Sequence, residues 1–174
     1  MQSTGLTVLW FLLIIGLIPL SLWVLKRSGM VVGTVPGLPS AIFEPYVQWA
    51  KGQIPIPAFA PTGGTNFMSF LSLSEAILGA LERGEPGKAY LVGDENLSFR
   101  EYFQLFFDAV GSDVQVEERD EEMPLLPDIA IPQGRGNWVR VDPPADEVAL
   151  LGYRRHDVAQ AVADVAAQFG GAAG

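Results

Sequence analysis

The chain has 174 residues, of which 49% are apolar, and this is enough for one domain with a substantial core. It contains no cysteine and one histidine, His156, which excludes disulfides, thiolate metal sites, a histidine metal cage and a Ser-His-Asp triad. The formal net charge is −9, and residues 1–30 contribute +2, so residues 31–174 carry −11 (−9 minus 2). Such an acidic body repels phosphate backbones, and we expect no nucleic-acid partner.

Residues 6–25, LTVLWFLLIIGLIPLSLWVL, form an uncharged run of twenty residues. As a helix this run would rise about 30 Å, the thickness of the hydrocarbon core of a bilayer. A tryptophan lies near each end and two cations follow, which predicts a transmembrane helix within residues 1–30 and a cytoplasmic C-terminal body. The alternatives are a buried apolar segment of a cytoplasmic protein, or a truncated or frameshifted start in which the run has no function.

Residues 31–174 are predicted to form a small α/β domain in which short strands alternate with helices. Proline- and glycine-rich stretches separate the elements and suit loops and edge strands better than central strands. The acidic run 117–122 and the proline-bearing stretch 123–138 are expected to be loops. The other expected elements are a linker at 33–40, a short helix within 42–51 ended by Gly52, extended chain at 53–66, and strands at 66–72, 88–93 and 113–118.

Two predicted helices begin with a capping box, in which a serine accepts the N3 amide and a glutamate reaches back to the serine amide. Ser72 and Glu75 open the first of these helices, and Ser98 and Glu101 open the second. Apolar side chains spaced by three and four residues are expected to face the core along one stripe of each helix. The helices are 73–83 with the stripe Leu73, Ile77, Leu78 and Leu81, then 99–110 with Phe99, Tyr102, Phe103, Phe106 and Val110, and finally 157–169 with Asp157 as its N-cap.

Residues 36–169 resemble the C-terminal part of the extended short-chain dehydrogenase/reductase family, the NAD-dependent epimerase/dehydratase group. The resemblance is carried by NFMSFLSLSEAILGALERGEPGKAYLVGDENLSFREYFQLFFDAVG and by the closing LLGYRRHDVAQAVADVAAQF. In that family a strand leads into a helix ending in a pattern like A-x-x-x-A-L-E-x-G, a Y-x-V-G strand follows, and the next helix opens with Ser or Thr. The resemblance implies a partial α/β fold, the substrate-binding lobe, preceded here by one long apolar N-terminal helix.

The resemblance does not extend to the chemistry of the family. The Gly-x-x-Gly-x-x-Gly turn that holds a cofactor pyrophosphate is missing, because Gly134-Arg135-Gly136 is too short and lies in a late loop. The Tyr-x-x-x-Lys pair is missing too, because Tyr46 and Lys51 are separated by four residues and would lie on different faces of a helix. We therefore expect no catalytic residue, cofactor site or metal site in this chain. NAD or NADP would bind only if a partner supplied the cofactor-binding Rossmann half.

Five residues are candidates for binding a small-molecule substrate. In the loop 124–140, two arginines, an amide and a tryptophan offer a fork for phosphate or carboxylate and a surface for stacking. The alternative is an ordinary surface loop. By the resemblance, an asparagine in the strand 66–72 is expected to line the same cleft. The candidates are Asn66, Arg135, Asn137, Trp138 and Arg140, whereas Arg154, Arg155 and His156 are expected to form a solvated turn.

Two functions fit these observations. The first is the substrate-binding portion of an NAD(P)-dependent epimerase, dehydratase or reductase, not catalytic by itself. The second is a membrane-anchored binding or interaction protein that uses the same lobe as a scaffold. The apolar run 6–25 distinguishes them, since only the second function requires it to enter a membrane.

Overall fold

The computed structural model describes residues 30–35, 38 and 40–169, and the predicted transmembrane helix at 6–25 lies outside these ranges. Strands and helices alternate along the described chain, as the sequence predicts for a mixed α/β fold. None of the helices described there is long and apolar enough to cross a membrane. In chain order the elements are β1 (Met30–Val32), α2 (Glu44–Ala50), β2 (Phe59–Pro61), β3 (Gly64–Ser69), α3 (Phe70–Arg83), β4 (Glu95–Ser98), α4 (Phe99–Ala109), β5 (Glu117–Arg119), the 3-10 turn η1 (Asp128–Ala130), α5 (Ala145–Leu151) and α6 (Val158–Gln168).

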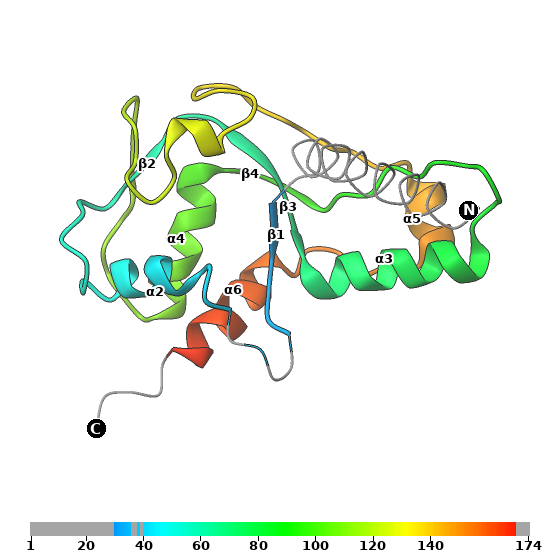
Figure 1. Ribbon diagram of the computed structural model, residues 1–174, viewed down its shortest axis with the longest axis horizontal. Helices are drawn as coiled ribbons and strands as arrows, with labels where there is room; N and C mark the ends of the chain where they lie inside the picture. Colours follow the sequence, from blue (N-terminus) through cyan, green and yellow to red (C-terminus); the bar gives the residue numbers. More distant parts are fainter. Residues whose placement is uncertain (1–29, 36–37, 39, 170–174) are drawn as a thin grey trace, which may run out of the picture.

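Two small sheets organise these elements. In the three-stranded sheet, β3 lies between β1, which is parallel to it, and β4, which is antiparallel. The second sheet consists of β2 and β5, which run parallel, and Pro61 ends β2 there. Figure 1 shows α2, α4 and α6 gathered on one side of the sheet strands and α3 with α5 on the other. The three-stranded sheet therefore joins two helical groups.

The core follows from the position of β3, whose six residues are all buried. Because successive side chains of a strand point to opposite faces, Phe67 enters one apolar cluster and Met68 the other. Phe67 stacks on Tyr102 of α4 with ring centroids 4.0 Å apart. The larger cluster continues through aromatic side chains of α2 and α4, including Trp49, which meets Phe107 edge-on at 4.7 Å. Aromatic packing of this kind holds α2 and α4 against the sheet.

The predicted helix at 99–110 is confirmed. Ser98 accepts the amide of Glu101 at 3.1 Å, and the Glu101 carboxylate accepts the Ser98 amide at 2.7 Å, which completes the capping box. The Ser98 hydrogen bonds hold the pKa of Glu101 below its usual range. The expected core stripe is buried from Phe99 to Phe106. The short helix within 42–51 is confirmed as α2, which Gly52 follows with a positive φ of 71°.

The predictions for α3 were wrong in both start and orientation. The helix begins at Phe70, because Ser69 is the N-cap and accepts the amide of Ser72 at 2.9 Å. The capping box expected at Ser72 and Glu75 does not form. Starting the helix three residues earlier makes β3 run into α3 without a loop. The buried face consists of Ser72, Ala76 and Gly79, whereas the predicted core stripe is largely exposed at Ile77, Leu78 and Leu81.

Other boundaries differ because pairing decides which extended segments become strands. Residues 88–93 have the apolar composition of a strand but pair with no described segment. The strand β4 forms instead at 95–98, where it pairs with β3 directly before α4. The strand expected at 113–118 is reduced to β5. Sequence reasoning also missed the short elements β1, which pairs with β3, and α5, which packs against α3.

Gly79 provides a test of the contact between α3 and α5. A Cβ at this position would overlap the carbonyl oxygen of Leu151. We expect Gly79→Ala to lower the free energy of unfolding by about 1–3 kcal/mol through overpacking, although alanine is the better helix former. Urea unfolding of the full chain measures this change. Glu82→Ala, on the exposed surface of the same helix, should stay within about 0.5 kcal/mol, and a stabilised Gly79→Ala variant would contradict the contact.

Candidate functional site

The loop that carries most candidate residues packs against the start of β3. Its backbone exchanges hydrogen bonds with Gly64, which donates to the carbonyl of Asn137 at 3.1 Å and accepts from Val139 at 3.2 Å. A Cβ on Gly64 would lie 2.6 Å from the Trp138 ring, so only glycine lets the indole lie on the strand. The neighbouring Gly63 has a φ of 102° and faces the same loop. The two glycines thus fix where Trp138 is held.

Arg140 lies over the exposed part of Trp138. Its guanidinium carbon is 4.7 Å from the ring centroid, a cation–π contact. Trp138 is 41% exposed, and no carboxylate of the described chain forms an ion pair with Arg140. The pair presents a positioned cation at the surface of an otherwise acidic molecule.

Arg135 and Asn137 are engaged within the loop. The Arg135 guanidinium pairs with Asp128 at 3.0 Å and with Asp120 at 3.7 Å. The Asn137 amide nitrogen donates to the carbonyl of Gln133 at 2.9 Å. The structure therefore brings Trp138 and Arg140 into contact, whereas the Asn137 side chain is bonded to Gln133 and Arg135 is paired with Asp128 of η1.

Asn66 lies behind the loop, in the interior of the sheet. It is 2% exposed, donates to the side-chain oxygen of Asn96 at 3.0 Å and accepts the amide of Asp94 at 3.1 Å. Asn96 in turn accepts the amide of Val141 at 2.9 Å. The two asparagines connect β3, β4 and the end of the candidate loop. Asn66 is therefore placed to support the loop, and substrate contact by its side chain stays a prediction.

The turn before α6 is exposed at Arg154 and His156, as predicted, and hydrogen bonds to α3 and to Asp94 also hold it on both sides. The backbone amide and the guanidinium of Arg154 each donate to the carboxylate of Glu75 in α3 at 2.9 Å. These hydrogen bonds hold the pKa of Glu75 below its usual range. Arg155 donates to the Asp94 carboxylate at 3.2 Å, and the His156 amide donates to the same carboxylate at 2.9 Å. The side chain of Asp94 is fully buried. His156 has the left-handed φ of 62°, which this anchoring maintains.

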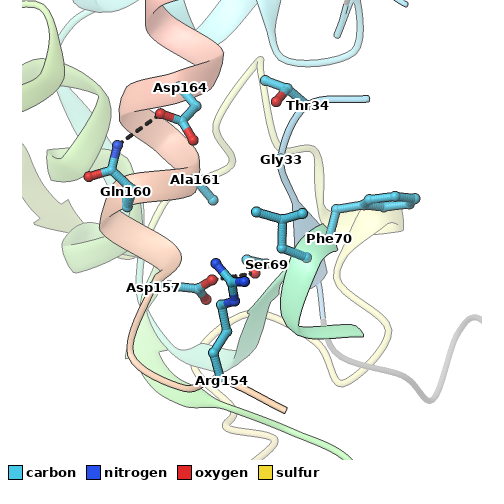
Figure 2. A pocket seen from close by; sticks show the side chains of 10 residues that line it. Gly33, Thr34, Ser69, Phe70, Arg154, Asp157, Gln160, Ala161 and Asp164 are labelled. Atoms are coloured by element: carbon cyan, nitrogen blue, oxygen red, sulfur yellow. Dashed lines mark hydrogen bonds between the residues drawn. The ribbon is translucent and has the colours of Figure 1, made fainter. Parts of the chain in front are cut away.

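A hollow of about 270 Å³ lies between the end of β1, the start of α3 and α6. Figure 2 shows Asp157 beside Ser69, whose hydroxyl donates to the Asp157 carboxylate at 2.8 Å. The same carboxylate accepts the hydroxyl of Ser72 at 2.9 Å. The carboxylate is thus not available to cap α6, and the expected N-cap hydrogen bond is absent. The sequence signalled Asp157 only as a cap, since its partners lie more than eighty residues away. The wall is completed by Gly33, Thr34, Phe70, Leu71, Arg154, Gln160, Ala161 and Asp164.

Asp94 provides a test of how the turn is held. We expect Asp94→Asn to lower the free energy of unfolding by about 2–3 kcal/mol, because an amide cannot replace the charge-assisted acceptor of Arg155 and the His156 amide. The matched control is Asp164→Asn, whose exposed carboxylate accepts only from Gln160 in the described chain. Urea unfolding measures both variants. Similar small losses in the two would show that the turn does not depend on the buried carboxylate.

The cofactor-binding features expected of a complete enzyme do not fit the described residues. In the glycine-rich turn at 134–136, the Gly136 amide donates to the Thr62 carbonyl at 2.9 Å. No helix begins directly after it, because α5 starts at Ala145. A dinucleotide pyrophosphate is held by free backbone amides at a helix N-terminus. This turn therefore cannot serve as that site.

Comparison with known proteins finds solved structures with a similar fold. No protein-family model matches the sequence, and no curated protein matches it either. The structure of RMD from Pseudomonas aeruginosa complexed with NADPH is similar over 80% of this chain and 45% of its own, with a TM-score of 0.55 and 14% identity. The crystal structure of gox2253 matches 81% of this chain and 47% of its own, with a TM-score of 0.55 and 18% identity.

A third similar structure is UDP-glucuronic acid 4-epimerase from Bacillus cereus in complex with UDP-glucuronic acid and NAD. It covers 81% of this chain and 44% of its own, with a TM-score of 0.51 and 16% identity. The chain thus spans less than half the length of each of these structures. At these identities the similarity concerns the fold alone. The described chain therefore shares part of its fold with these three structures.

Proposed function

We propose that this chain is the substrate-binding portion of an NAD(P)-dependent epimerase or reductase, and that it binds a nucleoside-diphosphate sugar. The observation that carries the proposal is the fold similarity, which includes a structure containing UDP-glucuronic acid and covers less than half of that structure. Arg140 and Trp138 support the choice of ligand, because they place a cation on an exposed aromatic side chain. NAD or NADP would come with a separate cofactor-binding half.

The geometry of the loop suits a diphosphate. Trp138 is held on Gly64 and restricts the position of the Arg140 guanidinium, so less rotamer freedom is lost when an anion binds. A guanidinium fork donates two parallel hydrogen bonds to phosphate oxygens. In this proposal the side-chain oxygen of Asn137 accepts from a sugar hydroxyl or a base N–H. In this proposal Arg135 and Asn66 act as positioning residues that hold the loop and the sheet behind it.

A membrane-anchored binding protein remains the second candidate, favoured by the uncharged run at 6–25. In that case the described body would be cytoplasmic and would bind its ligand at a membrane surface. Both the anchor and the location stay predictions. The ligand-binding loop is the same in the two candidates.

The ligand can be tested directly with UDP-glucuronic acid. We expect saturable binding by the full chain in isothermal titration calorimetry. Arg140→Ala should weaken it at least about tenfold, because charge-assisted hydrogen bonds of about 1.5–3 kcal/mol are lost. Trp138→Ala should weaken it too, since Arg140 loses its support, whereas Arg100→Ala on α4 should leave it unchanged. No binding by the wild-type chain, or equal binding by all variants, would refute this ligand assignment.

Cofactor binding can be tested separately by titrating NADH and NADPH into the same protein. We expect no saturable binding at micromolar concentrations, because the Gly136 amide of the glycine-rich turn at 134–136 is bonded to Thr62 and no helix follows this turn until α5 begins at Ala145. Binding of UDP-glucuronic acid by the same sample would show that the protein is folded. Saturable micromolar binding of either dinucleotide would disprove the need for a separate cofactor half.

A further inference from the structure

The hollow beside α6 has a carboxylate at each end. Asp157 and Asp164 both line it, the first directly before α6 and the second within that helix. A separation of seven residues is almost two full turns, so the two side chains project to the same side of the helix. Figure 2 shows both carboxylates on the side of α6 that faces Gly33 and Ser69, with Ala161 between them. The short side chain of Ala161 leaves room between the two carboxylates.

Apolar groups form most of the wall between these two ends. Ala161 belongs to α6, Phe70 and Leu71 to the first turn of α3, and Gly33 follows β1. Drug-sized ligands occupy pockets of about 300–1,000 Å³, so a hollow of about 270 Å³ suits a smaller molecule. A mainly apolar wall with a few polar groups is the usual composition of a small-molecule site.

The carboxylate of Asp157 is held in place and keeps part of its capacity to accept hydrogen bonds. Each of its two oxygens accepts one hydroxyl, from the buried residues Ser69 and Ser72. Because a carboxylate oxygen has two lone pairs, each oxygen retains one acceptor position. In the described chain, Asp164 accepts only from Gln160, at 2.8 Å. Neither aspartate forms an ion pair with a cation of the described residues.

The net charge of the walls is negative. Among the described residues that line the hollow, Arg154 is the one cation. Its Nε and Nη2 atoms donate to the carboxylate of Glu75, so these two charges offset each other. Asp157 and Asp164 then leave a charge of −2 (−1 and −1). Charge and shape together favour a ligand with two positive groups joined by an apolar chain.

We propose that this hollow binds a linear aliphatic diamine, with one ammonium group on Asp157 and the other on Asp164. The methylene chain would lie along Ala161 and the first turn of α3, where it is removed from water. The hollow shares no lining residue with the loop that carries Trp138 and Arg140. The proposal therefore fails or succeeds independently of the nucleoside-diphosphate sugar.

The distance between the carboxylates sets the length of the ligand. The Cα atoms of residues seven apart in a helix are separated by about 10.5 Å. Hydrogen bonds of about 2.8 Å at both ends leave at least about 5 Å between the two ammonium nitrogens. With ordinary single-bond lengths, the nitrogens of a five-carbon diamine extend to about 7.5 Å and those of a two-carbon diamine to about 4 Å. A five-carbon diamine can therefore reach both aspartates, whereas a two-carbon diamine cannot.

Isothermal titration calorimetry of the full chain with cadaverine, a five-carbon diamine, tests the site. The salt concentration is kept at about 0.15 M, so that general attraction to the acidic surface is screened beyond about 8 Å. We expect saturable binding at one site. Pentylamine, which has one ammonium group, and ethylenediamine, which has a two-carbon chain, should bind at least about tenfold more weakly, because each engages one carboxylate.

A matched pair of variants tests the role of Asp164. Asp164→Asn should weaken cadaverine binding at least about tenfold, since it removes one charged acceptor without disturbing the bonds of Asp157 to the two serines. The control is Asp108→Asn on α4. Asp108 is also exposed and also accepts from a glutamine four residues earlier, Gln104, at 2.9 Å. This variant has the same change in charge and should bind cadaverine like the wild-type chain.

Each other result would overturn the proposal. No saturable binding of cadaverine would show that the hollow is not a diamine site. Equal binding of pentylamine would mean that one carboxylate suffices, and equal weakening by Asp108→Asn would assign the effect to the overall negative charge. Lysine has the same two amino groups as cadaverine and an added carboxylate. Tighter binding of lysine than of cadaverine would show that Arg154 recognises an anion and that the ligand is an amino acid.

Discussion

The hydrogen bonds of Ser69 are the interaction on which the arrangement of this molecule depends. Its hydroxyl accepts the amide of Ser72 and donates to the carboxylate of Asp157, 88 residues later in the chain. The first contact starts α3 directly after β3, and the second attaches the start of α6 at the same point. Because the strand and the helix share this junction, the rotation of α3 about its axis is set there. That rotation turns Ile77, Leu78 and Leu81 outward and Ala76 and Gly79 inward.

The candidate ligand-binding loop is positioned by the opposite end of the same strand. Gly64 is the first residue of β3, and the Trp138 ring packs against it. Two residues later, Asn66 is hydrogen-bonded to Asn96, which contacts the end of the loop. The two ends of β3 thus have different roles. The first end positions a polar surface loop, and the second end determines which face of α3 is exposed. Burial of all six β3 residues keeps both ends fixed relative to each other.

Sequence reasoning succeeded where the signals are local. Helix α4 was predicted with its capping box and its buried stripe, because the Ser98–Glu101 contact spans three residues and the aromatic spacing is helical. The same reasoning failed for α3, where two serines three residues apart both suit an N-cap. In the structure both serines donate to Asp157, which no local pattern connects to either of them, and Ser69 is the N-cap because β3 ends at this residue. Among the candidate site residues, Trp138 and Arg140 were predicted as a stacking surface and a cation, but their mutual contact was not.

The sequence by itself determined the α/β class, the absence of cysteine and multi-histidine chemistry, the acidic charge and the uncharged run at 6–25. These properties follow from composition and from patterns within a few residues. Tertiary structure decided which arginine of the loop forms an ion pair. Asp120 and Asp128 pair with Arg135, whereas no carboxylate of the described chain pairs with Arg140. It also decided which face of α3 is buried. Both outcomes depend on contacts between segments distant in sequence, whose partners are selected only when the whole chain packs.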